Sequence, residues 1–101
     1  MAEWRDLQTL LKKLLGSENV YFQPPTGYIM SYPAIVFVRK PPHRVFAGDS
    51  VYFRLSCYEV TVIDNSPEGL IAKKVEELPY CSPTAHFKKD NLNHDVFTLY
   101  F

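Results

Sequence analysis

Apolar residues recur every three to four positions over residues 2–15, and polar or charged residues fill the positions between them. This spacing places the apolar side chains along one side of a helix. The apolar positions are Trp4, Leu7, Leu10, Leu11, Leu14 and Leu15. Gly16 follows directly and is a typical helix stop. We therefore predict an amphipathic helix over residues 2–15 whose apolar side packs against a sheet.

Short runs of β-branched and aromatic residues follow this helix. They predict strands over residues 20–23, 34–39, 51–64, 84–88 and 95–101. The second of these has no polar position between Ile35 and Val38. A strand without a polar side is usually covered on both faces. We expect this strand to be covered either within the chain or by a neighbouring subunit.

The longest strand-like run, residues 51–64, changes the phase of its apolar alternation near Ser56. One explanation is a β-bulge between Ser56 and Tyr58, which would turn the second half of the strand over. The alternative is that the second half is covered on both faces. The residues leave both possibilities open.

A second, shorter helix is predicted over residues 67–78. Ser66 is a good N-cap, Pro67 suits the first helical position, and Pro79 ends the segment. Together the elements predict one α+β domain over residues 1–101. Its sheet is single, mixed and mainly antiparallel, with four to five strands, and the N-terminal helix and the short second helix pack on it.

Composition and charge narrow the class of protein. Apolar residues make up 47% of the chain, and 11 basic residues balance 11 acidic ones. Binding to duplex DNA depends on neutralising phosphates, so zero net charge argues against a dedicated DNA-binding protein. No apolar stretch approaches the roughly 20 residues that cross a bilayer, and the N-terminus lacks a signal-peptide layout. We expect no membrane association.

The residues that usually carry chemistry are scattered. Cys57 and Cys81 lie 24 positions apart, and His43, His86 and His94 fall in separate segments. This spacing supports no zinc site, and we expect both cysteines to be reduced thiols in a cytoplasmic environment. The glycines form no phosphate-binding loop. We therefore predict no catalytic, cofactor or metal site.

Two arrangements that folding could create stay open at this point. Cys81 could meet His86 or His94 as a Cys–His pair, and Asp90 and Asp95 could act as paired carboxylates. The simpler interpretation is that the cysteine and histidines are ordinary strand residues. The two aspartates then serve turn formation and solubility.

Charge is distributed unevenly along the neutral chain. Residues 35–58 hold four basic residues and one acidic residue, whereas residues 59–78 hold two basic and five acidic ones. These segments form two solvated faces in the simpler interpretation. In the more specific interpretation, the basic loop of one copy contacts the acidic helix of the next copy, and the copies close a ring. A basic loop inside such a ring could contact DNA weakly and without sequence recognition.

Two segments resemble a known family. Residues 58–64 read YEVTVID, with Pro67 and the pair Leu78-Pro79 soon after, and residues 90–101 read DNLNHDVFTLYF. They are similar to the small tail completion or tail terminator proteins that join head and tail in long-tailed bacteriophages. The similarity extends from about Leu14 to Phe101, and residues 90–101 are its most specific part.

The resemblance implies a structural virion protein with no enzymatic activity. Such proteins form a ring, typically of six subunits, at the head-proximal end of the tail tube. The ring ends tube growth and presents a surface to the head connector. The implied partners are further copies of the chain, the tail tube protein and the head connector protein. The implied location is the virion tail, after assembly in the host cytoplasm.

Other functions remain as alternatives to this one. A head-side connector component, or another minor tail or adaptor protein, would use a similar building block, and a small enzyme is a distant third. The chain also has 15 aromatic residues, and tyrosine is enriched at protein interfaces. We predict that partner contacts are made by a loop containing Arg39, Lys40, Arg44 and Phe46.

Overall fold

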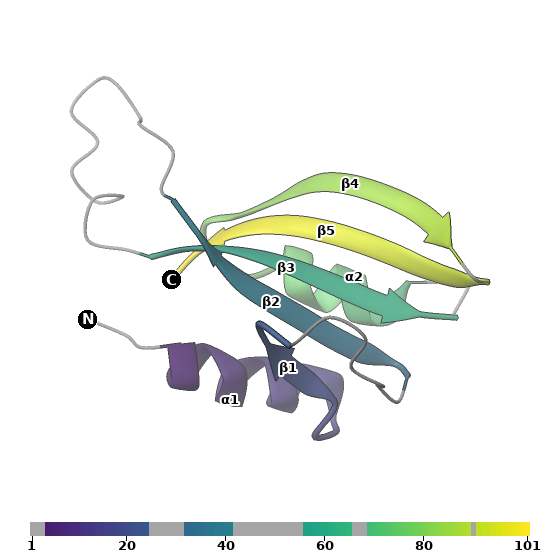
Figure 1. Cartoon of the computed structure of the whole chain (residues 1–101), viewed down its shortest axis with the longest axis horizontal. Helices are drawn as coiled ribbons and strands as arrows, with labels where there is room; N and C mark the ends of the chain where they lie inside the picture. The colour runs from purple at the N-terminus through teal and green to yellow at the C-terminus, as the bar shows by residue number, and fades with distance from the viewer. Residues whose placement is uncertain (1–3, 25–31, 42–55, 66–68, 90) are drawn as a thin grey trace.

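The computed structural model describes residues 4–24, 32–41, 56–65, 69–89 and 91–101. Its elements are, in chain order, α1 (Trp4–Leu15), β1 (Val20–Phe22), β2 (Ala34–Lys40), β3 (Cys57–Asp64), α2 (Leu70–Glu76), β4 (Cys81–Lys89) and β5 (Leu92–Tyr100). The five strands form one sheet in the order β1-β2-β3-β5-β4 (Figure 1). β1 and β2 are parallel, and the other neighbours are antiparallel. The predicted α+β fold, with a mixed sheet and two helices, is confirmed.

The core lies on one face of this sheet. The strand register places Phe37 of β2, Val60 of β3 and Phe97 of β5 side by side, and each is at most 3% exposed. Both helices cover this face: α1 contributes Leu7 and Leu11, and α2, behind the sheet in Figure 1, contributes Val75. Residues with opposite parity point to the other face, because side chains alternate along a strand.

A chain of aromatic rings links α1 to the centre of the sheet. Trp4 stacks on Phe22 with ring centroids 4.5 Å apart. Phe22 lies 4.9 Å from Phe37, and Phe37 lies 5.9 Å from Tyr58 in an edge-to-face arrangement. Such pairs add about 0.5–1.5 kcal/mol each beyond the area they bury. The N-terminal helix therefore contacts β1 directly and is linked through the ring of Phe22 to β2 and β3.

The end of α1 agrees with its prediction. The helix ends at Leu15, and Gly16 follows with φ 79°, a left-handed conformation that glycine adopts without strain. The Gly16 N–H donates to the Lys12 carbonyl over 2.8 Å. Residues 2 and 3, where the helix was predicted to begin, lie outside the described residues.

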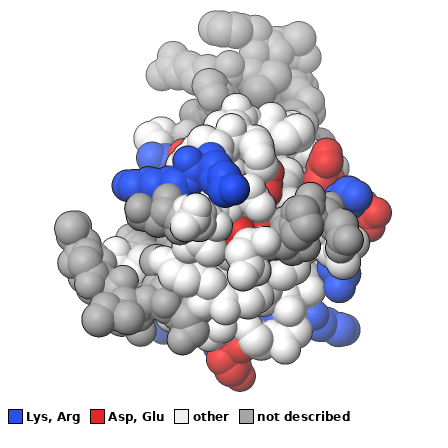
Figure 2. Space-filling model, turned by 90° about the vertical axis from the view of Figure 1, so that its right-hand side faces the viewer, with Lys and Arg blue, Asp and Glu red and all other residues white. Residues whose placement is uncertain are grey.

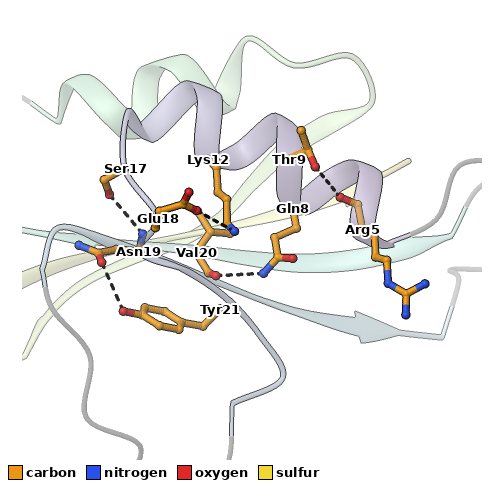
Figure 3. A network of polar contacts seen from close by, with 9 residues as sticks. All are labelled: Arg5, Gln8, Thr9, Lys12, Ser17, Glu18, Asn19, Val20 and Tyr21. Atoms are coloured by element: carbon orange, nitrogen blue, oxygen red, sulfur yellow. Dashed lines mark hydrogen bonds and ion pairs between the residues drawn. The ribbon is translucent and has the colours of Figure 1, made fainter.

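Polar contacts then hold β1 beneath α1 (Figure 3). The Gln8 side-chain amide donates to the Val20 carbonyl over 3.2 Å, and Lys12 forms an ion pair with Glu18 at 2.8 Å. On the side facing β2, the Ile35 N–H donates to the Asn19 carbonyl over 2.9 Å. The three-residue strand β1 is thus fixed from both sides.

Of the two explanations considered for the phase change, the β-bulge between Ser56 and Tyr58 does not form. Ser56 and Phe101 exchange backbone hydrogen bonds of 2.9 and 3.1 Å, and β3 pairs one-to-one with β5 from Cys57 onward. The alternative explains the pattern instead, because Val62, Ile63 and Asp64 are all buried although they point to alternate faces. The predicted strand portion at residues 51–55 lies outside the described residues.

The second helix is shorter than predicted. It spans Leu70–Glu76 rather than residues 67–78, and its N-cap is Gly69 with φ 62°. A left-handed residue cannot lie within a right-handed helix, so the helix begins after Gly69. At the other end the Leu78 N–H donates to the Val75 carbonyl, a tighter turn that ends the α-helix before Pro79. The proposed N-cap residue Ser66 lies outside the described residues.

The C-terminal hairpin is longer than predicted. β4 begins at Cys81 instead of Thr84, and β5 begins at Leu92 instead of Asp95. From Ser82 to Lys89 every residue of β4 is exposed, so the strand has no apolar alternation by which sequence could mark its ends. Strands β1 and β2 differ from their predicted bounds by single residues at their ends: β1 ends at Phe22 and β2 extends to Lys40.

The packing of α1 predicts a clear difference between two leucines. Leu11 is fully buried in the core and Leu70 is 55% exposed. Leu11→Ala is expected to lower the free energy of unfolding by about 2–5 kcal/mol, because it leaves a cavity. Leu70→Ala is expected to lower it by about 0.5 kcal/mol or less. Urea denaturation monitored by circular dichroism measures both, and equal losses would contradict the described core.

Candidate functional site

A polar cleft lies between α2 and the hairpin formed by β4 and β5. It has a volume of about 580 Å³. The ionisable and amide side chains that line it are Asn65, Lys73, Glu76, His86, Lys88, Asn91, Asn93 and Asp95. Figure 2 views the molecule from the end where the hairpin turns. It shows Lys and Arg side chains projecting from the surface, with some Asp and Glu atoms recessed near the centre and others projecting at the edges.

A single extra residue in β4 decides which side chains enter the cleft. Pro83 pairs with Phe97 and Ala85 pairs with Val96, so Thr84 has no partner of its own and forms a β-bulge. The Thr84 hydroxyl donates to the Val96 carbonyl over 3.0 Å. Beyond the bulge, every even-numbered residue of β4 faces the helices.

The bulge brings His86 and Asp95 together on the cleft side. They are register partners on β4 and β5, and the His86 Nδ1 lies 2.5 Å from the Asp95 Oδ1. The neighbouring pair, Phe87 and His94, points to the opposite face, where the two rings stack with centroids 4.8 Å apart. The hairpin thus presents a polar pair on one face and an aromatic pair on the other.

The cleft can recognise polar groups, and its geometry gives little support to acid–base catalysis. The His86 side chain is 63% exposed, whereas an efficient general base usually works where water is excluded. The nearby hydroxyl of Thr84 is already hydrogen-bonded to the backbone. Lys73, Lys88 and the asparagine amides supply donors, and Glu76 supplies an acceptor.

The sequence prediction did not identify the pair of His86 and Asp95, although a signal was present. Lys89 pairs with Leu92, three positions further along the chain, at the end of the hairpin. Asn91 has φ 61°, as such tight hairpin turns require. Counting back three pairs from this turn places His86 opposite Asp95.

The Cys–His pairs considered from the sequence do not form. Cys81 and His86 lie five positions apart on the same strand, which corresponds to about 16 Å. His94 points to the face opposite Cys81. Cys57 and Cys81 are free thiols, and they lie on opposite faces of the sheet. The paired-carboxylate alternative requires Asp90, which is outside the described residues.

Both thiols are less acidic than a free cysteine. Burial raises the pKa of Cys81 to about 11, and the nearby Glu76 carboxylate adds to the shift because a negative charge opposes thiolate formation. Burial also raises the pKa of Cys57, while a hydrogen bond with Tyr100 acts in the opposite direction and the Glu59 carboxylate raises it. Neither thiol is therefore set up as a nucleophile.

Two of the four predicted partner-contacting residues can be placed. Arg39 and Lys40 are exposed at the end of β2, and the Arg39 N–H donates to the Gln23 side chain over 3.2 Å. They alternate between the two faces of the strand. Arg44 and Phe46 lie outside the described residues. The role of these four residues in partner contacts stays a prediction.

The antiparallel pairing of β2 and β3 mixes the charges that are separated along the sequence. Lys40, from the basic segment, lies 3.9 Å from Glu59, from the acidic segment, and both side chains are about half exposed. Val38 is the register partner of Glu59, so the two charges share one face of the sheet. A sum of charge along the chain cannot anticipate this neutralisation, because it ignores which strands pair.

The described segments also give information on metal and membrane sites. Among these segments, no three His, Cys, Asp or Glu side chains are grouped so that they could hold a metal ion. None of the helices in the described part of the chain is long and apolar enough to span a bilayer.

Comparisons with family models, curated proteins and solved structures find no match to this chain.

The environment of Cys81 predicts slow thiol alkylation at neutral pH. With a pKa of about 11, its reaction with iodoacetamide should accelerate about tenfold per pH unit between pH 7 and 10, because only the thiolate reacts. Glu76→Gln should move this profile to lower pH, and Glu77→Gln serves as the control. Peptide-resolved mass spectrometry measures the rates. A pH profile that Glu76→Gln leaves unchanged would contradict the contribution of the Glu76 carboxylate to the raised pKa of Cys81.

The hairpin geometry predicts that His86 and Asp95 are energetically coupled. A double-mutant cycle with His86→Ala and Asp95→Ala should give a coupling of about 0.2–1 kcal/mol in the free energy of unfolding, as cross-strand pairs do. The matched cycle with His94→Ala and Asp95→Ala should give almost none, since His94 faces the other side. Urea denaturation at pH 6 supplies the values, and equal coupling in both cycles would refute the bulge-dependent pairing.

Proposed function

We propose that this chain is a structural protein of a long-tailed bacteriophage. It forms a ring at the head-proximal end of the tail, ends the growth of the tail tube and joins the tail to the head. Its partners are further copies of itself, the tail tube protein and the head connector protein. Contact with DNA in the ring lumen is weak and independent of sequence, in keeping with a formal net charge of zero.

The observation that carries this proposal is the pair of segments in which the sequence resembles head–tail joining proteins. Residues 58–64 and residues 90–101 are separated along the chain, but they supply neighbouring strands of the sheet. Residues 58–64 of β3 pair one-to-one with residues 93–99 of β5. The resemblance therefore covers one continuous structural unit, which is stronger support than two unconnected segments would be.

The fold gives general support. The resemblance implies a mixed sheet with helices packed on it, and the chain has this architecture. Because one fold serves many functions, this agreement is compatible with the proposed function without selecting it among others.

Exposed aromatic and aliphatic side chains also support a role in protein assembly. The large apolar residues left exposed are Tyr32 at 46%, Leu70 at 55%, Tyr80 at 50% and Phe87 at 46%. Leu70 lies on α2, which borders the cleft, whereas Phe87 lies on the opposite face of β4. Tyrosine and phenylalanine are enriched in protein interfaces, where their area contributes strongly to binding.

The proposal is tested with purified protein and isolated tail tubes. Electron microscopy should show rings, and the protein should cap one end of the tubes. The triple variant Arg39→Glu, Lys40→Glu, Arg44→Glu should weaken ring formation or tube binding by about tenfold or more, because contacts at these positions would become repulsive.

A charge-matched control separates local effects from net charge. Arg5, Lys13 and Lys74 are exposed on the helices and do not line the cleft, and their replacement by Glu changes the net charge equally. This control should keep wild-type assembly. A wild-type protein that stays monomeric at high concentration and does not bind tail tubes would refute the proposed function.

A further inference from the structure

We infer that copies of this chain associate through side-chain surfaces and do not extend the sheet from one copy to the next. Both edges of the described sheet, β1 and β4, are closed to an added strand. This inference rests on the self-association in the proposed function, and it specifies the kind of contact that a ring would use. It follows from the backbone groups that each edge leaves available.

At β1, α1 and the preceding turn occupy the outward backbone groups of Val20. Asn19 and Gln23 bond toward β2, through Ile35 and Phe37 respectively, so the alternation of the strand turns the Val20 backbone outward. The Val20 carbonyl accepts from Gln8 over 3.2 Å, and the Val20 N–H donates to the Glu18 carbonyl over 2.8 Å.

An incoming strand would therefore find few groups to bond at this edge. β1 has only three residues, and both outward groups of Val20 already have partners within the chain, which leaves Phe22 as the one other outward residue of the strand. The ion pair of Lys12 with Glu18 fixes the turn beside them (Figure 3).

At β4, Pro83 removes one outward donor. The Tyr80 carbonyl accepts from the Tyr100 N–H, so Tyr80 and Ser82 direct their backbone groups toward β5, and Cys81 and Pro83 direct theirs outward. Proline has no N–H to offer an added strand.

Two further features protect the rest of this edge. The bulge at Thr84 disrupts the regular spacing of outward backbone groups, and the exposed residues Lys88 and Lys89 end the strand with two positive charges. Proline, bulges and lysines are the devices by which proteins prevent pairing between edge strands. They leave the outward backbone groups of Cys81 and His86, which lie on either side of the bulge, so no run of regularly spaced outward groups remains.

The test measures amide hydrogen exchange in residues 20–22 and 81–89 at low and high protein concentration. Sedimentation velocity determines the oligomeric state in the same samples. When the wild-type protein assembles, these amides should exchange within about twofold of their rates in the monomer. Protection of either segment by tenfold or more on assembly would overturn the inference and leave the proposed ring function standing.

An unprotected variant tests the same inference even when the wild-type protein stays monomeric. It combines deletion of Thr84 with Pro83→Thr, Lys88→Thr and Lys89→Thr. Deleting Thr84 keeps both registers, because Pro83 pairs with Phe97 and Ala85 with Val96. This variant should self-associate at concentrations where the wild-type protein does not, and residues 81–89 should gain tenfold or greater protection. A folded variant that remains monomeric would refute the role of these features.

Controls distinguish edge exposure from general loss of charge or fold. The variant Lys13→Thr, Lys74→Thr removes two exposed lysines from the helices and leaves β4 intact, so it should stay in the wild-type oligomeric state. If the full variant does not fold by circular dichroism, Pro83→Thr, Lys88→Thr, Lys89→Thr replaces it with the bulge retained. The same two outcomes then apply to that variant.

Discussion

The pairing of β3 with both of its neighbours is the constraint on which the rest of the structure depends. β3 lies between β2 and β5, and its register aligns Phe37, Val60 and Phe97 on the face that the helices cover. A slip of one residue in either pairing would turn a whole strand over and expose its apolar side chains. The positions of α1 and α2 follow, because their buried leucines and valine need this aligned face.

The hairpin of β4 and β5 combines this ordered sheet with a local irregularity. β5 continues the core through Phe97 and Leu99, whereas β4 is almost entirely exposed. The extra residue Thr84 lets the two halves of β4 keep their pairing with β5 while the side-chain alternation is reset. One residue therefore determines both the composition of the cleft and the irregular outer edge of the sheet.

The parts of the fold that could be predicted are those with local patterns. The spacing of leucines in α1 is set within the helix, and Gly16 marks its end. By contrast, the start of β4 carries no alternation because both faces of the strand are exposed. Gly69 was expected inside the second helix, and its left-handed conformation places the helix start after it. The cleft depends on the meeting of His86 and Asp95, which requires the turn and the register as well as residue types.

The strand order has a consequence for local unfolding. β4 hydrogen-bonds only to β5 among the described strands, and no residue of β4 belongs to the fully buried core. Separation of β4 would leave β1, β2, β3 and β5 as a continuous four-stranded sheet with α1 still packed on it, whereas α2 would lose its contacts with β4. Proteins open most easily where few apolar contacts must be broken. Among the described strands, β4 is thus the one whose separation breaks the fewest buried apolar contacts, and local opening of the sheet is expected to begin there.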